Sequence, residues 1–227
     1  MREYESLVHN IHLPCDGQND WVWPIDDAVL WHLLPVEWLA MKGIINKYCP
    51  GTVKSDEHPT IAIQAGGCLG MYPRMMAGLF HTVYTFEPHP VNFHCLSMNC
   101  QLPNIIKTQG ALGKETGQDL LYETTIDNMG QHYVDGSSRE VPERRTGTAY
   151  PVQTHTIDSL NLPACTFIQL DVEGYEEEVL LGSINTIDEF EPVIVLEFPD
   201  ESTTRLLKTL GYVLAEVVLA DSVFVKK

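Results

Sequence analysis

From residue 60 onward, short apolar runs alternate with segments whose apolar residues recur at helical spacing. Buried strands are predicted for the runs at 60–64, 82–87, 104–110, 166–171 and 192–198. Helices are predicted over about 72–80, over 90–100, from near Gly174, and over about 201–210. This alternation predicts an α/β fold, with a mostly parallel sheet and helices on both of its faces.

Two segments depart from this rhythm. The apolar stretch 212–226 predicts two strands joined near Ala220 and Asp221, and this hairpin adds one antiparallel strand to the sheet near the C-terminus. Residues 114–155 are polar, rich in Gly and Thr, and poor in helical periodicity. They are therefore predicted to form an insertion of loops and short strands.

The first part of the chain, residues 1–59, differs in character from the main domain predicted for 60–227. It holds every tryptophan of the sequence: Trp21, Trp23, Trp31 and Trp38. Pro35 is predicted to be the first residue of a helix that Gly51 ends, so this part is interpreted as a helical extension. The tryptophans are interpreted as packing against the main domain. The alternative is a lid, or a surface for a partner or for a second copy of the chain.

The charge balance limits the possible partners. The 227 residues include 14 Lys plus Arg against 31 Asp plus Glu, a formal net charge of -17. Such a chain repels phosphate backbones, so bulk binding of nucleic acid is not expected. The basic cluster of Arg139, Arg144 and Arg145 is interpreted as a solvated loop.

Neither a secretion signal nor a membrane span is predicted. The first residues, MREYE, lack the basic-then-apolar order of a signal peptide, and no apolar stretch approaches the roughly 20 residues of a membrane helix. The six cysteines form no Cys-x-x-Cys pair, and we interpret them as reduced core residues of a cytoplasmic protein. His89, His94, Cys95 and Cys100 match no familiar ligand spacing, so no metal site is predicted.

In open parallel sheets, ligands bind beyond the carboxyl ends of the strands, near the point where the strand order reverses. The first strand ends in QAGGCLG, where Gly66, Gly67 and Gly70 allow a sharp turn and a close approach to a ligand. The alternative role of these glycines is to pack the strand against a helix. The G-x-G-x-x-G pattern is absent because position 68 is Cys, and this disfavours a nicotinamide-dependent dehydrogenase.

The next three strand ends point to a nucleoside. Glu87 ends the second strand twenty residues after Gly67, where a carboxylate can accept hydrogen bonds from the hydroxyls of a ribose; helix capping is the alternative. The third strand ends in QGALG at 109–113, whose small residues leave room for an adenine ring. Asp171 ends the fourth strand at the edge of the same pocket. A nucleoside-containing ligand is therefore predicted.

The motifs IQAGGCLG, TFEPHP, GALG, THTIDSL and IQLDVEGYEEEVLLG resemble, in order and spacing, those of FkbM-type S-adenosylmethionine-dependent methyltransferases. The resemblance covers about residues 60–200. It implies a seven-stranded Rossmann-like methyltransferase sheet, S-adenosylmethionine as cofactor, and O-methylation of a sugar or another small hydroxylated compound. The cofactor contacts that it implies are Gln64, Gly66, Gly67, Gly70, Glu87, Pro88, Ala111, Leu112 and Asp171.

The chain departs from the family pattern in its glycine loop and in the turn after the fourth strand. The family commonly has Asp at the position of Gln64, and Gly-Ala-Asn where this chain has Gly-Gly-Cys at 66–68. It usually has His at the position of Tyr175. The glycines that shape the turn remain, whereas the polar contacts to the methionine part of the cofactor change. These changes motivate a second hypothesis, an inactive domain that serves as a binding or structural subunit.

Methyl transfer needs an acceptor aligned with the methyl group and a base that takes its proton. Asp171 is expected to face the cofactor or the acceptor, and Glu173 to act as the base or to orient the acceptor. His155 and His132 are alternative bases, or else surface or strand histidines. The expected acceptor contacts are Asn128, Gly130, His132 and Tyr175.

The remaining acids near the site have simpler interpretations. Glu176, Glu177 and Glu178 fall in the first turns of a helix, where the helix dipole favours negative charge, and at least two of them are expected only to be solvated. Asp158 is expected to cap a short helical turn.

Overall fold

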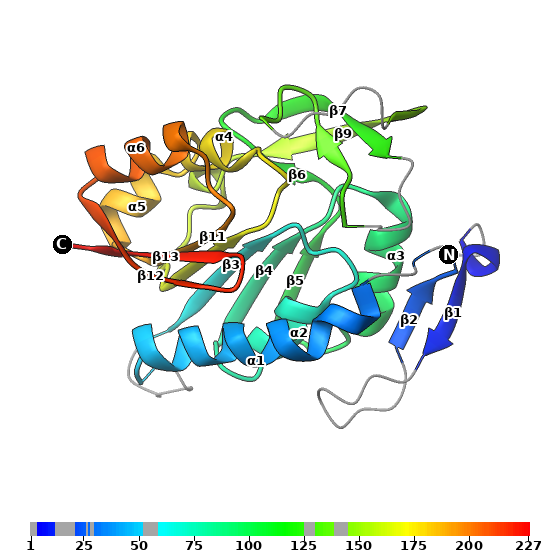
Figure 1. Cartoon of the computed structure of the whole chain (residues 1–227), viewed down its shortest axis with the longest axis horizontal. Coiled ribbons are helices and arrows are strands. Elements are labelled where there is room, and N and C mark those ends of the chain that lie inside the picture. Colours follow the sequence, from blue (N-terminus) through cyan, green and yellow to red (C-terminus); the bar gives the residue numbers. More distant parts are fainter. Residues whose placement is uncertain are drawn as a thin grey trace.

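A computed structural model describes residues 4–11, 21–25, 27, 30–51, 59–124, 130–138 and 145–227. Its main sheet has seven strands in the order β12-β13-β11-β10-β3-β4-β5 (Figure 1). The bounds are β3 Ile61–Ala65, β4 Thr82–Phe86, β5 Ile105–Thr108, β10 Phe167–Leu170, β11 Val193–Glu197, β12 Tyr212–Val218 and β13 Asp221–Lys226. β13 runs antiparallel to both of its neighbours, while β11, β10, β3, β4 and β5 pair in parallel. The chain thus forms an α/β fold on a mixed sheet, as predicted.

The strand order reverses at β3. From β3 the chain adds β4 and β5 on one side, and it later adds β10 and β11 on the other side. The carboxyl ends of β3 and β10 therefore border the crevice in which ligands of open α/β sheets bind.

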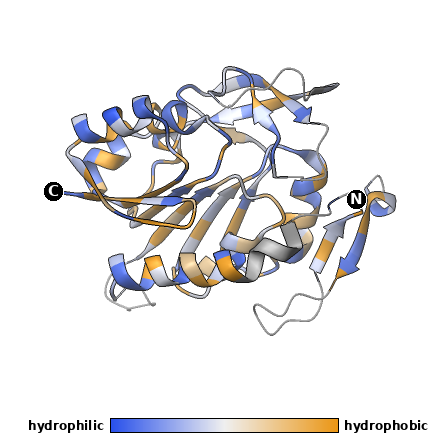
Figure 2. Ribbon diagram, in the orientation of Figure 1, coloured by the Kyte–Doolittle hydropathy of each residue, from blue (hydrophilic) through white to orange (hydrophobic). Residues whose placement is uncertain are grey.

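Helices cover both faces of the sheet (Figure 1). Their bounds are α1 Leu30–Tyr48, α2 Met71–Met76, α3 Pro90–Asn99, α4 Glu176–Leu181, α5 Ile184–Phe190 and α6 Glu201–Thr209. Successive strand residues point to opposite faces, so Phe167 joins the core beneath α1, α2 and α3, whereas Ile168 joins the core beneath α4, α5 and α6. Hydrophobic and hydrophilic residues alternate along α1 (Figure 2), as expected of a helix with one face on the core.

The predicted strands of the main sheet agree with the structure to within two residues at each end. The second and last predicted helices also match α3 and α6 closely. The helix predicted over about 72–80 was too long, because α2 ends at Met76 and a series of turns follows. The separate helix α5 was not predicted, because only Gly182 and Ser183 divide it from α4.

The insertion at 114–155 contains more regular structure than predicted. It contributes to a second sheet of order β6-β9-β7-β8, drawn at the top of Figure 1. Its strands are β6 Ala111–Leu112, β7 Gly117–Thr124, β8 Tyr133–Val134 and β9 Arg145–His155. β7 and β9 run for 8 and 11 residues, so the prediction of only short strands was wrong. They lack apolar runs because β9 is mostly exposed and few residues of β7 are buried, and this hides them from a search for buried strands.

The N-terminal part is more than a helix. A 3-10 turn at Glu5–Leu7 leads into β1 Val8–Ile11, which pairs antiparallel with β2 Trp21–Pro24. α1 starts at Leu30, so the prediction that Pro35 opens the helix was wrong. The residues before Pro35 include Leu30, Leu33 and Leu34, which favour helix, and they extend α1 backward.

The tryptophans of this part are buried where the structure describes them. Trp21, Trp23 and Trp38 belong to the same core cluster as Phe167 of the main sheet. The side chain of Trp31 lies outside the described part. No described helix is long and apolar enough to cross a membrane.

The cysteines divide into two groups. Cys49, Cys95, Cys100 and Cys165 are buried and form no disulfide with another described residue, as predicted, and Cys15 lies outside the described residues. Cys68 differs, because it is partly exposed and lines a cavity. Of the basic cluster, Arg139 and Arg144 also lie outside the described residues.

Candidate active site

A cavity of about 360 Å³ opens at the carboxyl ends of the central strands. Its wall includes the turn after β3, the ends of β4, β10 and β11, residues of α1 and α2, and the second sheet. Small-molecule sites in proteins typically measure roughly 300–1,000 Å³. The cavity therefore has the place and the size expected of a ligand site in this fold.

The turn after β3 depends on glycine. Gly66 has φ +78, and a Cβ there would lie 1.8 Å from the carbonyl oxygen of Asp171. The N–H groups of Gly66 and Gly67 both donate to the carbonyl of Phe86, at 3.1 and 2.9 Å. Both glycines line the cavity, as predicted for a close approach of backbone to ligand. Gly70 does not line it, and a Cβ at Gly70 would meet Cys100 Sγ at 2.6 Å, which is the packing role.

Gln64 is a structural support of this turn. Its side chain is fully buried, and its Nε2 donates to the carbonyls of Ala65 and Gly66 at 3.1 and 2.9 Å. Its Oε1 accepts from the Thr85 hydroxyl at 2.6 Å. Gln64 is not among the described residues that line the cavity, so the predicted direct contact with a cofactor does not fit its position.

Glu87 forms a fixed carboxylate in the wall of the cavity. Its Oε2 accepts from the Cys68 backbone N–H and its Oε1 from the His89 backbone N–H, both at 2.7 Å. Burial raises the pKa of Glu87 to about 7, although these two N–H groups favour the ionised form. The Asn92 side chain also hydrogen-bonds to this carboxylate, which keeps capacity to accept a further hydrogen bond.

The wall beside Glu87 suits the nucleoside predicted from the sequence. Pro88, Ala111 and Leu112 all line the cavity. Leu121 and Val134 of the second sheet add further apolar surface, and both are buried. A carboxylate next to an apolar wall matches a ribose and its flat base, so these residues fit the adenosine part of S-adenosylmethionine.

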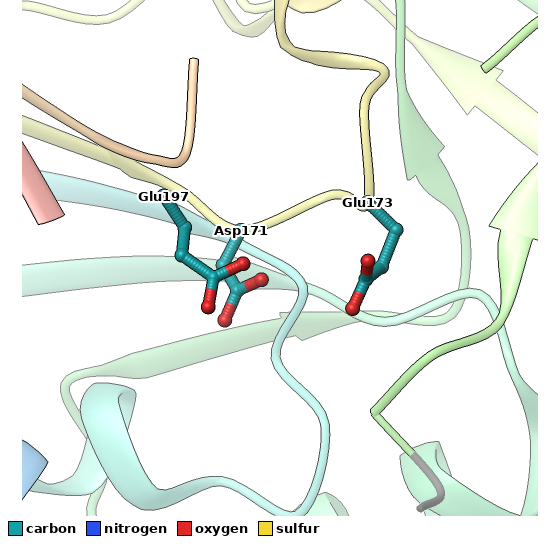
Figure 3. A group of neighbouring side chains, drawn as sticks. All are labelled: Asp171, Glu173 and Glu197. Carbon is teal, nitrogen blue, oxygen red and sulfur yellow. The ribbon is translucent and has the colours of Figure 1, made fainter. Parts of the chain in front are cut away.

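The end of the cavity formed by β10 and β11 is acidic. Asp171, Glu173 and Glu197 follow β10 and end β11, and one oxygen of each lies within 4.8 Å of the others. Figure 3 shows the carboxylates of Asp171 and Glu197 side by side, with that of Glu173 across from them. Burial, and then the charges of Glu197 and Glu173, raise the pKa of Asp171 well above its usual range, and Asp171 shares a hydrogen bond with Glu197. Among the described lining residues there is no Lys or Arg.

The turn that carries Glu173 is held by a buried acid. Glu173 has φ +52, a conformation that non-glycine residues rarely adopt. Glu176 Oε1 accepts from the N–H groups of Val172 and Gly174 at 3.4 and 3.3 Å. Glu176 is therefore buried and structural. Glu177 and Glu178 are partly exposed, but they bond to Ser202 and Lys114, so the prediction that at least two of the three acids are only solvated was wrong.

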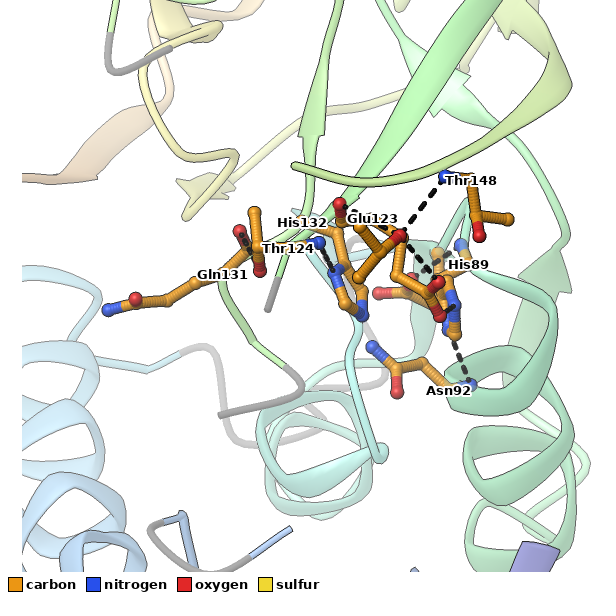
Figure 4. Close-up of polar contacts among 9 residues, drawn as sticks. His89, Asn92, Glu123, Thr124, Gln131, His132 and Thr148 are labelled. Carbon is orange, nitrogen blue, oxygen red and sulfur yellow. Dashed lines mark hydrogen bonds and ion pairs between the residues drawn. The ribbon is translucent and has the colours of Figure 1, made fainter. Parts of the chain in front are cut away.

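His132 lines the cavity in its neutral form. Its Nδ1 accepts from the Thr124 N–H at 3.3 Å, and its ring lies 4.3 Å from that of His89 (Figure 4). Burial, and then the neighbouring His89, lower the pKa of His132 to about 3. With Nδ1 accepting, the ring proton of a neutral imidazole sits on Nε2, which has no partner among the described residues. His132 is thus suited to donate a hydrogen bond and not to act as the base.

The other residues predicted to bind the acceptor or to act as the base differ in whether they line the cavity. Gly130 and Tyr175 line the cavity, and the Tyr175 hydroxyl donates to Asp119 at 3.2 Å. His155 is not among the described lining residues, and its ring packs 6.3 Å from that of Phe86. Asn128 lies outside the described residues.

Asp158 is a helix cap, as predicted, although of a different helix. Its carboxylate accepts from the N–H groups of Asn185 and Thr186 at 3.1 and 2.8 Å, in the first turn of α5.

Several lining residues were missed by sequence reasoning: Trp23, Glu37, Tyr72 and Glu197. Glu197 could have been found, because it ends the fifth predicted strand just as Asp171 ends the fourth. Glu37 and Tyr72 lie on α1 and α2, and no local pattern marks a helix residue that faces a distant strand end.

Comparison with known protein families identifies the family of the chain. The sequence model of the methyltransferase FkbM domain matches residues 67–214, well over half of the chain. The chain therefore belongs to the FkbM methyltransferase family. No curated protein matches the chain significantly.

Solved structures similar to this chain share little sequence with it. A methyltransferase FkbM from Methylobacillus flagellatus is 18% identical with a TM-score of 0.49, and the match covers 73% of this chain but 43% of that one. A precorrin-6y methyltransferase from Geobacter metallireducens is 12% identical, with a TM-score of 0.42 and coverage of 78% and 86%. An rRNA methylase from Streptococcus thermophilus is 13% identical, with a TM-score of 0.43 and coverage of 84% and 92%. The chain thus spans less than half the length of the Methylobacillus protein.

Proposed function

We propose that this protein transfers the methyl group of S-adenosylmethionine to a hydroxyl oxygen of a small acceptor such as a sugar. The observation that carries the proposal is the Glu87 carboxylate, fixed by two backbone N–H groups in the wall of the cavity. Glu87 directly follows β4, the strand next to β3 in the sheet, and a carboxylate at this strand end can bind a ribose. Membership of the FkbM family supports the same cofactor.

The residues that would hold the cofactor follow from their places in the cavity. Glu87 would accept the ribose hydroxyls, and Ala111 and Leu112 would pack against the adenine. Beyond the ribose, the methionine part would lie over the turn at Gly66 and Gly67, toward the end of β10. When bound, the cofactor supplies an activated methyl group on its sulfur.

The chain's own contribution is to position an acceptor and to manage its proton. Glu173 faces the cavity from the turn after β10, where its carboxylate can take the proton of an acceptor hydroxyl. His132 can donate from Nε2 to another acceptor oxygen. The second sheet and α1 border the cavity, and this favours the exclusion of competing water.

The test is calorimetric titration of the protein with S-adenosylhomocysteine, beside the Glu87→Ala variant. Micromolar affinity, a binding free energy of about 8 kcal/mol, is expected for the parent protein. A loss of at least tenfold is expected in Glu87→Ala. The matched control is Glu189→Ala, which removes an exposed carboxylate on α5 and should bind like the parent.

Absence of binding by the folded parent protein would contradict the proposal. It would favour the alternative, a methyltransferase fold retained as a binding or structural subunit. If S-adenosylhomocysteine does bind, the acceptor is tested by incubating the protein with S-adenosylmethionine and a panel of sugars, and by detecting methylated products by mass spectrometry. Methylation of amines and of no hydroxyl compound would contradict the O-methylation.

A further inference from the structure

The acidic end of the cavity has the dimensions of a cation site. Oxygens of Asp171, Glu173 and Glu197 all lie within 4.8 Å of one another. In a coordination shell with metal–oxygen distances of about 2.1–2.4 Å, oxygens on opposite sides of the ion are about 4.2–4.8 Å apart. All three carboxylates can therefore reach one ion.

A fourth carboxylate supports this interpretation independently. Asp221 begins β13 directly opposite Glu197 in the sheet register, and it is 4% exposed. Its side chain has no hydrogen bond or ion pair with any described residue, and it is repelled by Glu197 and by Glu37 of α1. Buried carboxylates are normally paired or bound to metal, so an unpartnered one beside three others favours a cation at this place.

Tyr72 shows that these acids converge on one region. Its hydroxyl lies within electrostatic range of Asp221, Glu37, Asp171 and Glu197 at once. These four residues come from β13, α1, the turn after β10 and the end of β11. Their convergence is a property of the tertiary fold and not of one acidic segment.

The charge and the chemistry of the group favour a divalent ion. A monovalent cation would offset only one negative charge of this group, whereas a divalent ion offsets two. All the ligand atoms are carboxylate oxygens, the donors preferred by Mg²⁺, Mn²⁺ and Ca²⁺. The sequence analysis predicted no metal site because it considered histidine and cysteine spacing, and these carboxylates come from separate strand ends.

We propose that Asp171, Glu173 and Glu197 bind a hard divalent cation, with Asp221 as a neighbouring carboxylate that adds to its attraction. The cation site itself does not depend on the acceptor proposed above. A second part of the proposal is that the ion holds an acceptor hydroxyl and makes its proton easier to remove. This part rests on the proposed function.

The experiment is titration with MnCl₂ of protein that has been treated with EDTA and then dialysed, followed by electron paramagnetic resonance of free Mn²⁺. One Mn²⁺ per chain is expected, with at least tenfold weaker binding in Glu197→Gln and in Asp171→Asn. Mg²⁺ or Ca²⁺ should compete for the same site. Glu189→Gln, which removes an exposed charge on α5, should bind Mn²⁺ like the parent protein.

Thermal unfolding in EDTA shows whether the variants fold. Removing one charge from a crowded acidic group relieves repulsion, so Glu197→Gln should melt at or above the temperature of the parent. No bound Mn²⁺ at millimolar concentration, or equal loss of binding in Glu189→Gln, would overturn the proposal. Titration with S-adenosylhomocysteine in EDTA separates the two proposals, because Glu87 is not one of the three proposed ligands and needs no metal to bind a ribose.

Discussion

The backbone N–H of Cys68 donates to the Glu87 carboxylate at 2.7 Å. This bond ties the glycine turn after β3 to the end of β4, so two of the strand ends that border the cavity are held in one arrangement. The residue that replaces a polar side chain of the family thus contributes through its backbone, and this contact does not involve its side chain.

The first prediction concerns the pH dependence of cofactor binding. The pKa of Glu87 is raised from 4.5 to about 7 by burial, and the ionised carboxylate is the better acceptor for ribose hydroxyls. Affinity for S-adenosylhomocysteine should therefore be highest above pH 7 and fall as the pH decreases through about 7, by at most about tenfold per pH unit. Calorimetry from pH 5.5 to 8.5, roughly centred on this pKa, measures the effect.

The control for this prediction is Glu87→Gln, whose affinity should be lower and independent of pH in this window. His89 and His132 have pKa values of about 4 and 3, so they remain neutral throughout. For the ligand-free protein the sign is opposite. The stability contributed by the raised pKa of Glu87 is present below about 4.5 and is lost as the pH rises through about 7.

The second prediction separates steric from backbone effects at the glycine turn. Gly66 and Gly136 have nearly equal positive φ values of +78 and +81, but only at Gly66 would an added Cβ have neighbours within 4 Å. Gly136→Ala should cost about 1–2 kcal/mol through its backbone alone. Gly66→Ala should cost about 1–3 kcal/mol more, because its Cβ would overlap the Asp171 carbonyl. Urea denaturation measures both, and equal losses would show that the turn relaxes freely.

The third prediction compares two buried glutamines. Gln64 and Gln169 pair directly across β3 and β10, and both are fully buried. Gln64 makes three hydrogen bonds, whereas neither amide atom of Gln169 has a partner among the described residues. Gln64→Met should destabilise the protein by about 2–3 kcal/mol, while Gln169→Met should be neutral or stabilising by about 1 kcal/mol. A stabilising Gln64→Met would contradict its role as a support of the turn.

The fourth prediction tests Glu173 as the base. Glu173→Gln removes the proton acceptor but keeps the size of the side chain, so turnover should fall by about a hundredfold or more. Affinity for S-adenosylhomocysteine should change less than twofold, roughly the scatter of additivity between independent sites. Steady-state kinetics with an identified acceptor measures the first, and calorimetry the second. Turnover equal to that of the parent protein would remove Glu173 from the chemistry.

Strand ends were the part of the site that sequence could predict. Glu87 and Asp171 were found because apolar runs end at them, and the carboxyl ends of parallel strands lie together at the edge of the sheet where ligands bind. The orientation of Gln64 could not be found in this way. It lies within β3, and only the neighbouring Thr85 and the shape of the turn decide that its amide points to backbone and not to ligand.

Contributions from other elements were also beyond the sequence pattern. Glu37 reaches the cavity because α1 packs across the sheet, and no local periodicity gives the position of a helix relative to a distant strand. β9 was not predicted because most of its residues are exposed and so carry no apolar run. Prediction from sequence therefore worked for buried strands, which an apolar run marks in the sequence. It failed for residues whose position depends on how distant elements pack together.

The position of Trp21, Trp38 and Met41 in the core shared with Phe167 bears on how the protein can be divided. The family match begins at residue 67, yet one face of the sheet is covered by residues that precede it. Truncation at that boundary would expose an apolar face of the sheet to water and would remove Trp23 and Glu37 from the wall of the cavity. The smallest portion able to fold and bind is therefore larger than the segment that matches the family, and trimming to that segment should yield aggregates.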